Sequence, residues 1–261
     1  MSAKLELQTV LKENNRDTTH PDVIAAIENL SNLWKTSKDE SIYKISKSPT
    51  QSVAVYGDWV TISAPPYPGR IITEDKPDLY QYTLGRLSFN IFQPRDLLCT
   101  INSITNMVHK VDSLSCHEEL GDVTYNNKVY ITFHTPDGDL PGEIIIEGFC
   151  YPDPENNHRS IVAFVGGVMC KPETVEKDDT LNQIWMKTFG NAYSNADKER
   201  GYIESITRYL MKIILNLEMP TDDSQRYKMK RIMKGYLDYL YLDDNLKITK
   251  GNHGSITIVQ K

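Results

Sequence analysis

The chain has 261 residues, 39% of them hydrophobic and 25% charged, which are the proportions of an ordinary globular protein. Its formal net charge of -6 weighs against a nucleic-acid-binding protein, which normally presents a basic face. No apolar run approaches the roughly 20 residues of a membrane-spanning helix, and the first residues resemble neither a secretory signal nor an organelle transit peptide.

Sequence motifs for catalysis and metal binding are absent. The four cysteines, at positions 99, 116, 150 and 170, show no CxxC spacing, so free thiols in a reducing compartment are expected. The six histidines form neither an i, i+4 pair nor an HExxH motif, which argues against a metal site. There is no GxSxG nucleophile motif and no GxxxxGK(S/T) phosphate loop. We therefore expect no enzyme activity, no metal and no cofactor.

The first fifty residues are predicted to contain one helix. Residues 1–18 are polar and are expected to lack stable structure, whereas a helix is predicted from Pro21, with Thr19 as its cap. Its apolar residues share one helical face, and they are Val23, Ile27, Leu30 and Trp34. We therefore divide the chain into an N-terminal tail and helix, residues 1–50, and a β-barrel domain, residues 51–261.

Six strands are predicted between residues 51 and 169. Each has alternating or β-branched apolar residues bounded by turn residues, and the strands span 51–62, 79–92, 97–108, 128–135, 143–151 and 160–169. Four prolines and a glycine make residues 64–78 a long loop. The other connections are short, which favours antiparallel pairing and leaves no room for crossover helices.

Residues 178–241 are predicted to form a helical insertion in the barrel domain. A short helix is expected over 181–189, a second over 203–217 and a less regular third over 227–240. The apolar face of the second helix, flanked by Arg208 and Lys212, would suit a lipid surface. It would equally suit packing on the barrel, closing the barrel mouth or docking a partner protein.

The end of the chain predicts a β-hairpin. Leu246 and Ile248 alternate with polar residues, a glycine-containing turn follows, and Ile256 and Ile258 alternate again. An isolated hairpin is not stable in water, so it has to complete a sheet begun earlier. We expect it to pair with the opening strand and to close a mainly β fold, an antiparallel barrel of about eight strands. Such a barrel is wide enough for one small apolar ligand.

Three segments together resemble the plastid lipid-associated protein (fibrillin) family. They are the Gly57-Asp-Trp59 tripeptide after a helix, residues 80–94 (YQYTLGRLSFNIFQP) and the closing motif at 241–254 (YLDDNLKITKGNHG). The resemblance implies a lipocalin-like barrel that binds lipids or other apolar small molecules, with a structural or carrier role. It also implies a plastid location at lipid bodies or thylakoids. Without it, a cytoplasmic location is expected.

The candidate ligand-binding residues are Trp59, Tyr82, Arg86, Phe89 and Phe133. Trp59 would form the base of a ligand cavity or belong to an ordinary core. Arg86, on the strand predicted over 79–92, would bind an anionic head group such as a fatty-acid carboxylate, or else be solvated or ion-paired.

The closing motif also supplies Asp243 and Lys247, for which we expect a structural role as a partly buried pair that fixes the register of the last strand.

Two functions are compatible with the sequence. The first is non-enzymatic binding or carriage of a lipid or apolar molecule inside the barrel, with possible contact to a membrane or lipid-body surface. The alternative is a protein-interaction scaffold that has a filled barrel and docks a partner through the helices of 178–241. A lipid-transforming enzyme is a third hypothesis, but no acid–base constellation supports it. The volume of the barrel interior distinguishes the first two hypotheses.

Overall fold

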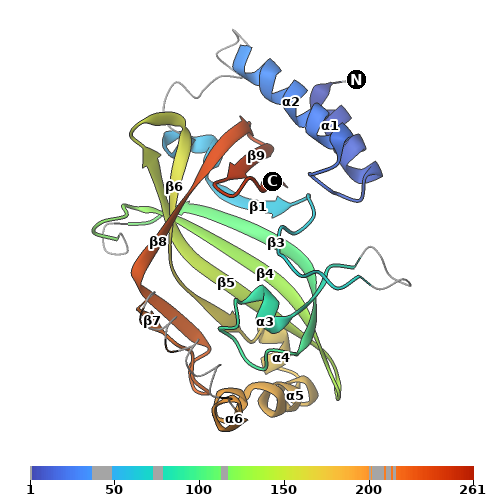
Figure 1. Ribbon diagram of the computed structural model, residues 1–261, viewed down its shortest axis with the longest axis vertical. Coiled ribbons are helices and arrows are strands. Elements are labelled where there is room, and N and C mark those ends of the chain that lie inside the picture. The colour runs from blue at the N-terminus through green and yellow to red at the C-terminus, as the bar shows by residue number, and fades with distance from the viewer. Residues whose placement is uncertain are drawn as a thin grey trace.

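The computed structural model describes residues 2–36, 49–72, 79–112, 117–199, 201, 209, 213 and 216–261 (Figure 1). Within these residues, eight antiparallel strands close into a barrel, so the predicted fold class is confirmed. In order around the barrel they are β1 (Gly57–Thr61), β10 (Ile256–Gln260), β9 (Leu246–Gly251), β8 (Arg226–Leu242), β6 (Asn156–Cys170), β5 (Gly138–Asp153), β4 (Val123–Thr135) and β3 (Leu98–Lys110). Two short strands, β2 (Gln81–Thr83) and β7 (Leu217–Glu218), pair with β3 and β8.

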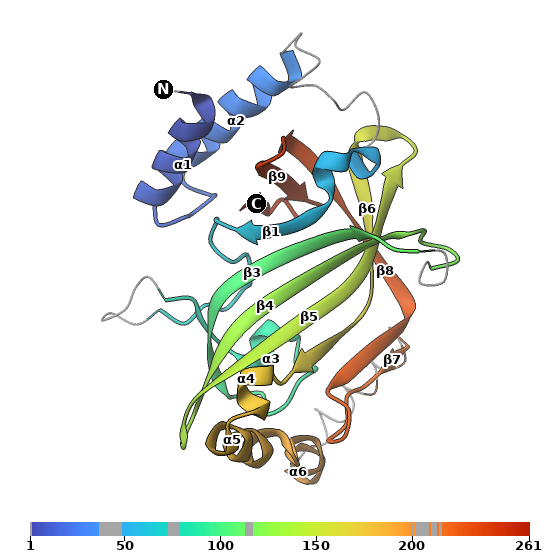
Figure 2. The same cartoon turned by 180° about the vertical axis from the view of Figure 1, so that it is seen from behind.

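The barrel closes at β1, which pairs with strands from both ends of the sheet. On one side Thr61 lies opposite Val259 of β10, and on the other Trp59 lies opposite Asn106 of β3. The prediction that the terminal hairpin pairs with the opening strand is therefore confirmed. Strands β3 to β6 form the predicted antiparallel meander and make one long wall of the barrel (Figure 2).

The long strand predicted over residues 79–92 is wrong. Only β2 is extended there, and a helical turn, α3 (Leu84–Leu87), follows it. Thr83 caps this turn by accepting a hydrogen bond from the Arg86 N–H, and the Ser88 hydroxyl donates to the Leu84 carbonyl. Such local side chain–backbone bonds compete with a strand ladder. The strand predicted over 51–62 begins only at Gly57. Two 3-10 turns, η1 (Pro49–Gln51) and η2 (Val53–Val55), occupy the residues before it.

The helix predicted over 227–240 is also wrong, because these residues belong to strand β8. The strand lies between β6 and β9 and hydrogen-bonds to both, so the barrel could not close without it. Its many tyrosines favour an extended strand, and pairing on two sides outweighs the partly helical spacing of its apolar residues. The helix predicted over 203–217 lies almost entirely outside the described residues.

The N-terminal residues fold into two helices rather than one. The predicted helix is confirmed as α2 (Pro21–Thr36), but residues 1–18, expected to lack structure, contain α1 (Ala3–Glu13). Ser2 caps α1, and α1 buries Leu7 and Leu11 against α2 and the barrel. A short helix with two buried leucines is stable only through such packing, which the sequence does not reveal. At the start of α2 the Ile24 N–H donates to the carbonyl of His20, so Thr19 is not the cap.

Among the described residues, β6 is followed at the opposite end of the barrel by the helices α4 (Glu173–Glu176), α5 (Asp179–Phe189) and α6 (Ala192–Glu199) (Figure 2). The short helix predicted over 181–189 is confirmed as α5, with Asp178 as its cap. Trp185 and Phe189 of α5 pack on Phe133 of β4, with ring centroids 6.2 and 5.1 Å away. The helix therefore covers the barrel end that lies away from α1 and α2.

Candidate functional site

One row of inward-facing side chains runs around the middle of the barrel. Strand register sets these residues side by side on successive strands, because side chains on one face of a sheet recur in register. From β1 to β8 they are Trp59, Asn106, Asn127, Ile146, Gly167 and Tyr227. The row is polar where it starts, near β1, and apolar where it ends, near β8.

Lys247 of β9 reaches into the polar part of this row. It is only 3% exposed, and its Nζ donates a hydrogen bond to Asn106 Oδ1 at 2.7 Å. The same Nζ lies 4.7 Å from the ring centroid of Trp59, within the range of a cation–π interaction. Asn106 in turn donates from Nδ2 to Asn127 Oδ1 at 3.1 Å. The network holds an amino group in place inside the barrel.

The environment of Lys247 disfavours its charged form. Burial lowers the pKa of Lys247 to about 7, and the nearby cation of Lys261 acts in the same direction, while the Cys150 thiol opposes it. Burial also raises the pKa of Cys150 to about 12, so this thiol stays protonated at neutral pH. Among the ion pairs of the described residues, none joins Lys247 to a carboxylate. A protonated Lys247 is therefore a buried cation without a counter-ion from those residues.

Trp59 closes the barrel next to the 3-10 turns. Its Nε1 donates to the Val55 carbonyl at 2.8 Å, and the side chain is completely buried. Lys261 lies over the same ring at 4.3 Å and donates to the Ala54 carbonyl at 3.0 Å. The ring thus joins the turn η2, the end of the chain and Lys247, as a base residue of the barrel would.

The interior next to Lys247 is bordered by inward side chains of β4 that are only partly buried. Tyr125 and Asn127 lie on the inward face of β4, yet both keep partly exposed surface. Burial nevertheless raises the pKa of Tyr125 above its usual range, as it does for Tyr239 of β8, and both tyrosines interact electrostatically with Cys150. We interpret the remaining exposed surface of these two inward side chains as space that other side chains do not fill.

The predicted ligand-binding residues do not form one site. Tyr82 and Phe133 lie on opposite sides of Cys99, because each pairs with it from a different neighbouring strand, and both are buried in the core near α5. Trp59 belongs to the other core cluster, near α1 and α2. Arg86 is exposed on α3, and Phe89, which is 64% exposed with a positive φ, lies just beyond it.

The expected pairing of Asp243 with Lys247 is wrong. Asp243 accepts a hydrogen bond from Lys4 of α1 at 2.7 Å and another from the Tyr241 hydroxyl at 2.7 Å. It faces the helices, whereas Lys247 faces the barrel interior. The sequence analysis placed Lys247 in the closing motif but missed its partner Asn106. The sequence signal for an inward lysine is its position between two apolar residues, Leu246 and Ile248, which are both buried in the structure.

Two grooves lie outside the barrel rather than within it. One, of about 650 Å³, runs between α2, the Pro65–Pro66 loop and the tip of the β9–β10 hairpin. The other, of about 450 Å³, lies between α1 and α2 near Tyr241. The first is lined by side chains of both charges, including Glu28 and Lys250, so its lining favours no particular class of ligand.

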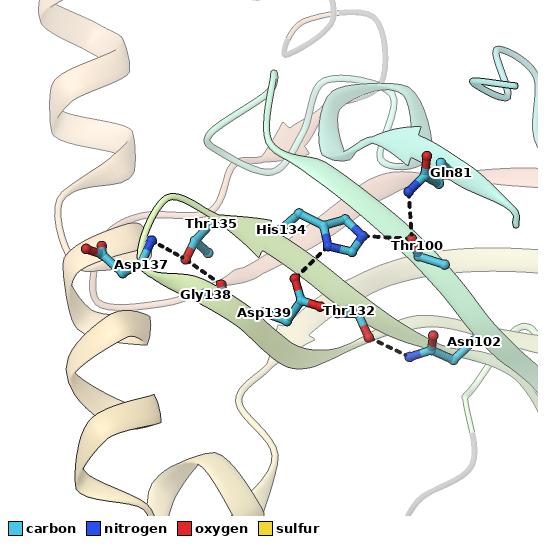
Figure 3. Close-up of polar contacts among 9 residues, drawn as sticks. All are labelled: Gln81, Thr100, Asn102, Thr132, His134, Thr135, Asp137, Gly138 and Asp139. Atoms are coloured by element: carbon cyan, nitrogen blue, oxygen red, sulfur yellow. Dashed lines mark hydrogen bonds and ion pairs between the residues drawn. The ribbon is translucent and has the colours of Figure 1, made fainter. Parts of the chain in front are cut away.

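A second polar cluster lies on the outer face of β3 and β4, near the β4–β5 hairpin (Figure 3). Thr100 Oγ1 lies 2.8 Å from His134 Nε2, and His134 Nδ1 lies 2.7 Å from Asp139 Oδ1. Gln81 of β2 donates to the same Thr100 hydroxyl at 3.4 Å. With its proton on Nδ1, His134 accepts from Thr100 and donates to Asp139, the order of groups in a hydroxyl–imidazole–carboxylate triad.

Order alone does not make this cluster a nucleophilic site. A substrate carbonyl has to reach the hydroxyl, and the oxyanion needs hydrogen-bond donors. Thr100 is only 7% exposed. It lies within β3 and pairs with Gln81 of β2. Asp139, by contrast, is on the open side of the hairpin. We interpret the cluster as a bridge that ties β2, β3 and the β4–β5 hairpin together.

Comparisons of the chain with protein-family models, curated proteins and solved structures found no match. The resemblance to the fibrillin family is thus supported only as far as an eight-stranded antiparallel barrel. Within the described ranges, no group of three or more histidine, cysteine or acidic side chains gathers as a metal site would. None of the helices in those ranges has both the length and the apolar character that crossing a bilayer requires.

Proposed function

We propose that the protein binds one small apolar molecule inside its barrel and holds or carries it without changing it chemically. The observation that carries this proposal is that Tyr125 and Asn127, on the inward face of β4, are only partly buried. Ligand sites are typically concave and mainly apolar, with a few placed polar groups. The barrel supplies this combination in Lys247 and Asn106 next to layers of aliphatic side chains.

The apolar part of the proposed site begins at Ile146, an inward side chain of the middle row that is only partly buried. The adjoining layer is buried and packed: Ile104, Val129, Ile144 and Met169. A hydrocarbon chain against the free surface of Ile146 would leave water at roughly 0.8 kcal/mol per buried CH₂ group. Binding would therefore strengthen with chain length until the interior is full.

The test is uptake of a neutral apolar fluorophore, N-phenyl-1-naphthylamine, by purified and delipidated protein, with displacement by dodecanol. We expect saturable uptake by the wild type and none by Ile146→Trp, because Ile146 faces inward in the middle row and a larger ring there fills the space. Val53→Trp is the matched control, since Val53 is 80% exposed. No uptake by the wild type, or equal uptake by both variants, would refute the proposal.

The scaffold hypothesis has less support from the described residues. Within the segment 178–241, the apolar side chains Trp185 and Phe189 of α5 are buried against Phe133 and are not open to a partner. A docking helix over 203–217 stays a prediction, as do a plastid location and contact with a lipid-body surface. Pull-down with a chain that lacks residues 202–215, and imaging of a fluorescent fusion, would test them.

A further inference from the structure

The amino group of Lys247 has hydrogen-bonding capacity that the described residues do not use. An ammonium has three N–H donors, and Asn106 Oδ1 accepts one of them. A second side of the amino group faces the ring of Trp59, which contacts it without forming a hydrogen bond. At least one donor is left for a group that enters the barrel.

We infer that the ligand is a long-chain carboxylic acid whose carboxylate pairs with Lys247 while its hydrocarbon chain extends past Ile146 on the inner face of the barrel. This inference rests on the proposed function and names its ligand class. A buried ammonium is strongly unfavourable unless an anion pairs with it. A ligand carboxylate provides that anion where the strands provide none.

The geometry suits a carboxylate head in particular. Asn106 and Asn127 form the polar part of the row, and the Asn127 amide keeps its own N–H donors for a second carboxylate oxygen. Aliphatic side chains begin one strand further, at Ile146. An amphipathic acid therefore meets donors at one end and hydrocarbon along its length.

Arg86 was the residue predicted from the sequence to hold such a head group, but it is exposed on α3. Lys247 takes over that role from inside the barrel. A lysine also differs from an arginine in a measurable way, because an arginine side chain stays charged throughout the accessible pH range. Binding through Lys247 therefore depends on pH, whereas binding through an arginine does not.

Few of the groups that face Lys247 titrate near neutral pH. Cys150 of β5 keeps its proton, and burial likewise keeps Tyr125 of β4 and Tyr239 of β8 neutral. Lys261, on the far side of the Trp59 ring, is exposed to solvent. Lys247 itself, whose pKa burial lowers to about 7, then governs the pH dependence of acid binding.

The experiment compares dodecanoic acid with dodecanol as competitors for bound N-phenyl-1-naphthylamine between pH 6 and 9. The acid is ionised throughout this range. In the wild type we expect the acid to bind more tightly than the alcohol at pH 7. The affinity for the acid should then fall about tenfold per pH unit above the pKa of Lys247. The affinity for dodecanol should not change with pH.

Three variants sharpen the comparison. Lys247→Met should lose about tenfold to a hundredfold of its affinity for the acid at pH 6 and keep its affinity for the alcohol. Lys247→Arg should bind the acid equally well at pH 7 and 9. Lys250→Met removes an exposed lysine from the same strand and should behave as the wild type. If a variant does not fold, the pH profile of the wild type decides.

The outcomes separate the two proposals. Equal affinity of the wild type for acid and alcohol, with no pH dependence, overturns the carboxylate inference and leaves the proposed function standing. Failure of both competitors to bind, together with no uptake of the fluorophore, overturns the proposed function itself.

Discussion

The buried Lys247 should make the stability of the folded protein depend on pH in a way that one substitution removes. The perturbation is Lys247→Met, which keeps most of the length of the side chain and deletes its charge. The wild type has to bury an amino group that prefers to be protonated in water. The variant does not, so the difference between their free energies of unfolding isolates the titration of this one group.

The magnitude follows from the two pKa values of Lys247, about 7 in the folded protein and 10.5 as the ordinary value. Each pH unit between them changes the free energy of unfolding by about 1.4 kcal/mol, so the whole effect approaches about 5 kcal/mol. The unfolded chain binds the proton more tightly. Relative to the variant, the wild type is therefore most stable above pH 10.5, loses stability as pH falls towards 7 and changes no further below it.

The assay is urea denaturation of both proteins, without ligand and with a reductant, at intervals from pH 6 to 10. Groups other than Lys247 titrate alike in the two proteins, so their effects cancel in the difference. The substitution also leaves Asn106 Oδ1 without its donor, which costs about 1–3 kcal/mol at every pH and shifts the difference without tilting it. Parallel curves, with a constant difference from pH 7 to 10, would refute a desolvated Lys247.

Three further changes test other parts of the structure. Burial opposes ionisation of Asp243, but its hydrogen bonds lower its pKa overall; Asp243→Asn should therefore cost about 2 kcal/mol at pH 7, and urea titrations should show this loss fade as pH falls below about 4. Trp185→Ala should cost about 3–5 kcal/mol by opening the barrel end, whereas Met186→Ala, at an exposed position, should stay within about 0.5 kcal/mol; equal effects would contradict the cap. Thr100→Val should cost about 1 kcal/mol by removing the bridge to His134, without changing hydrolysis of p-nitrophenyl acetate; faster hydrolysis by the wild type would instead indicate a working triad.

Alternation of apolar and polar residues was enough to predict the meander β3–β6 and the terminal hairpin. Each of these strands is bounded by turn residues, and its partner follows directly in the chain, so local sequence determines the pairing. Strand β8 has this advantage on one side only. Its partner β9 follows directly, but residues 171–225 separate it from its other partner β6, and its apolar spacing at Ile232, Met233 and Leu237 also fits a helix. Tertiary pairing decided between the two.

The site was less predictable than the fold for a related reason. On β9 both faces are covered, one by α2 and one by the barrel interior, so Leu246, Lys247 and Ile248 are all buried. Burial on both faces removes the contrast by which a sequence shows which residues face inward. Trp59 was found because it follows a glycine in a recognisable motif. Asn106 has no such signal, since its role depends on a lysine 141 positions away.

The closure of the barrel by its first and last strands has a consequence for how the chain folds. The contact between Val60 and Gln260 joins residues about 200 positions apart, so forming this seam costs the conformational entropy of a long loop. Other contacts offset that cost only when nearly the whole chain has folded. Until then β1 and β10 each present an open edge to any other extended chain. Slow refolding with aggregation at high protein concentration, relieved by dilution, is the behaviour to expect of such a late-formed seam.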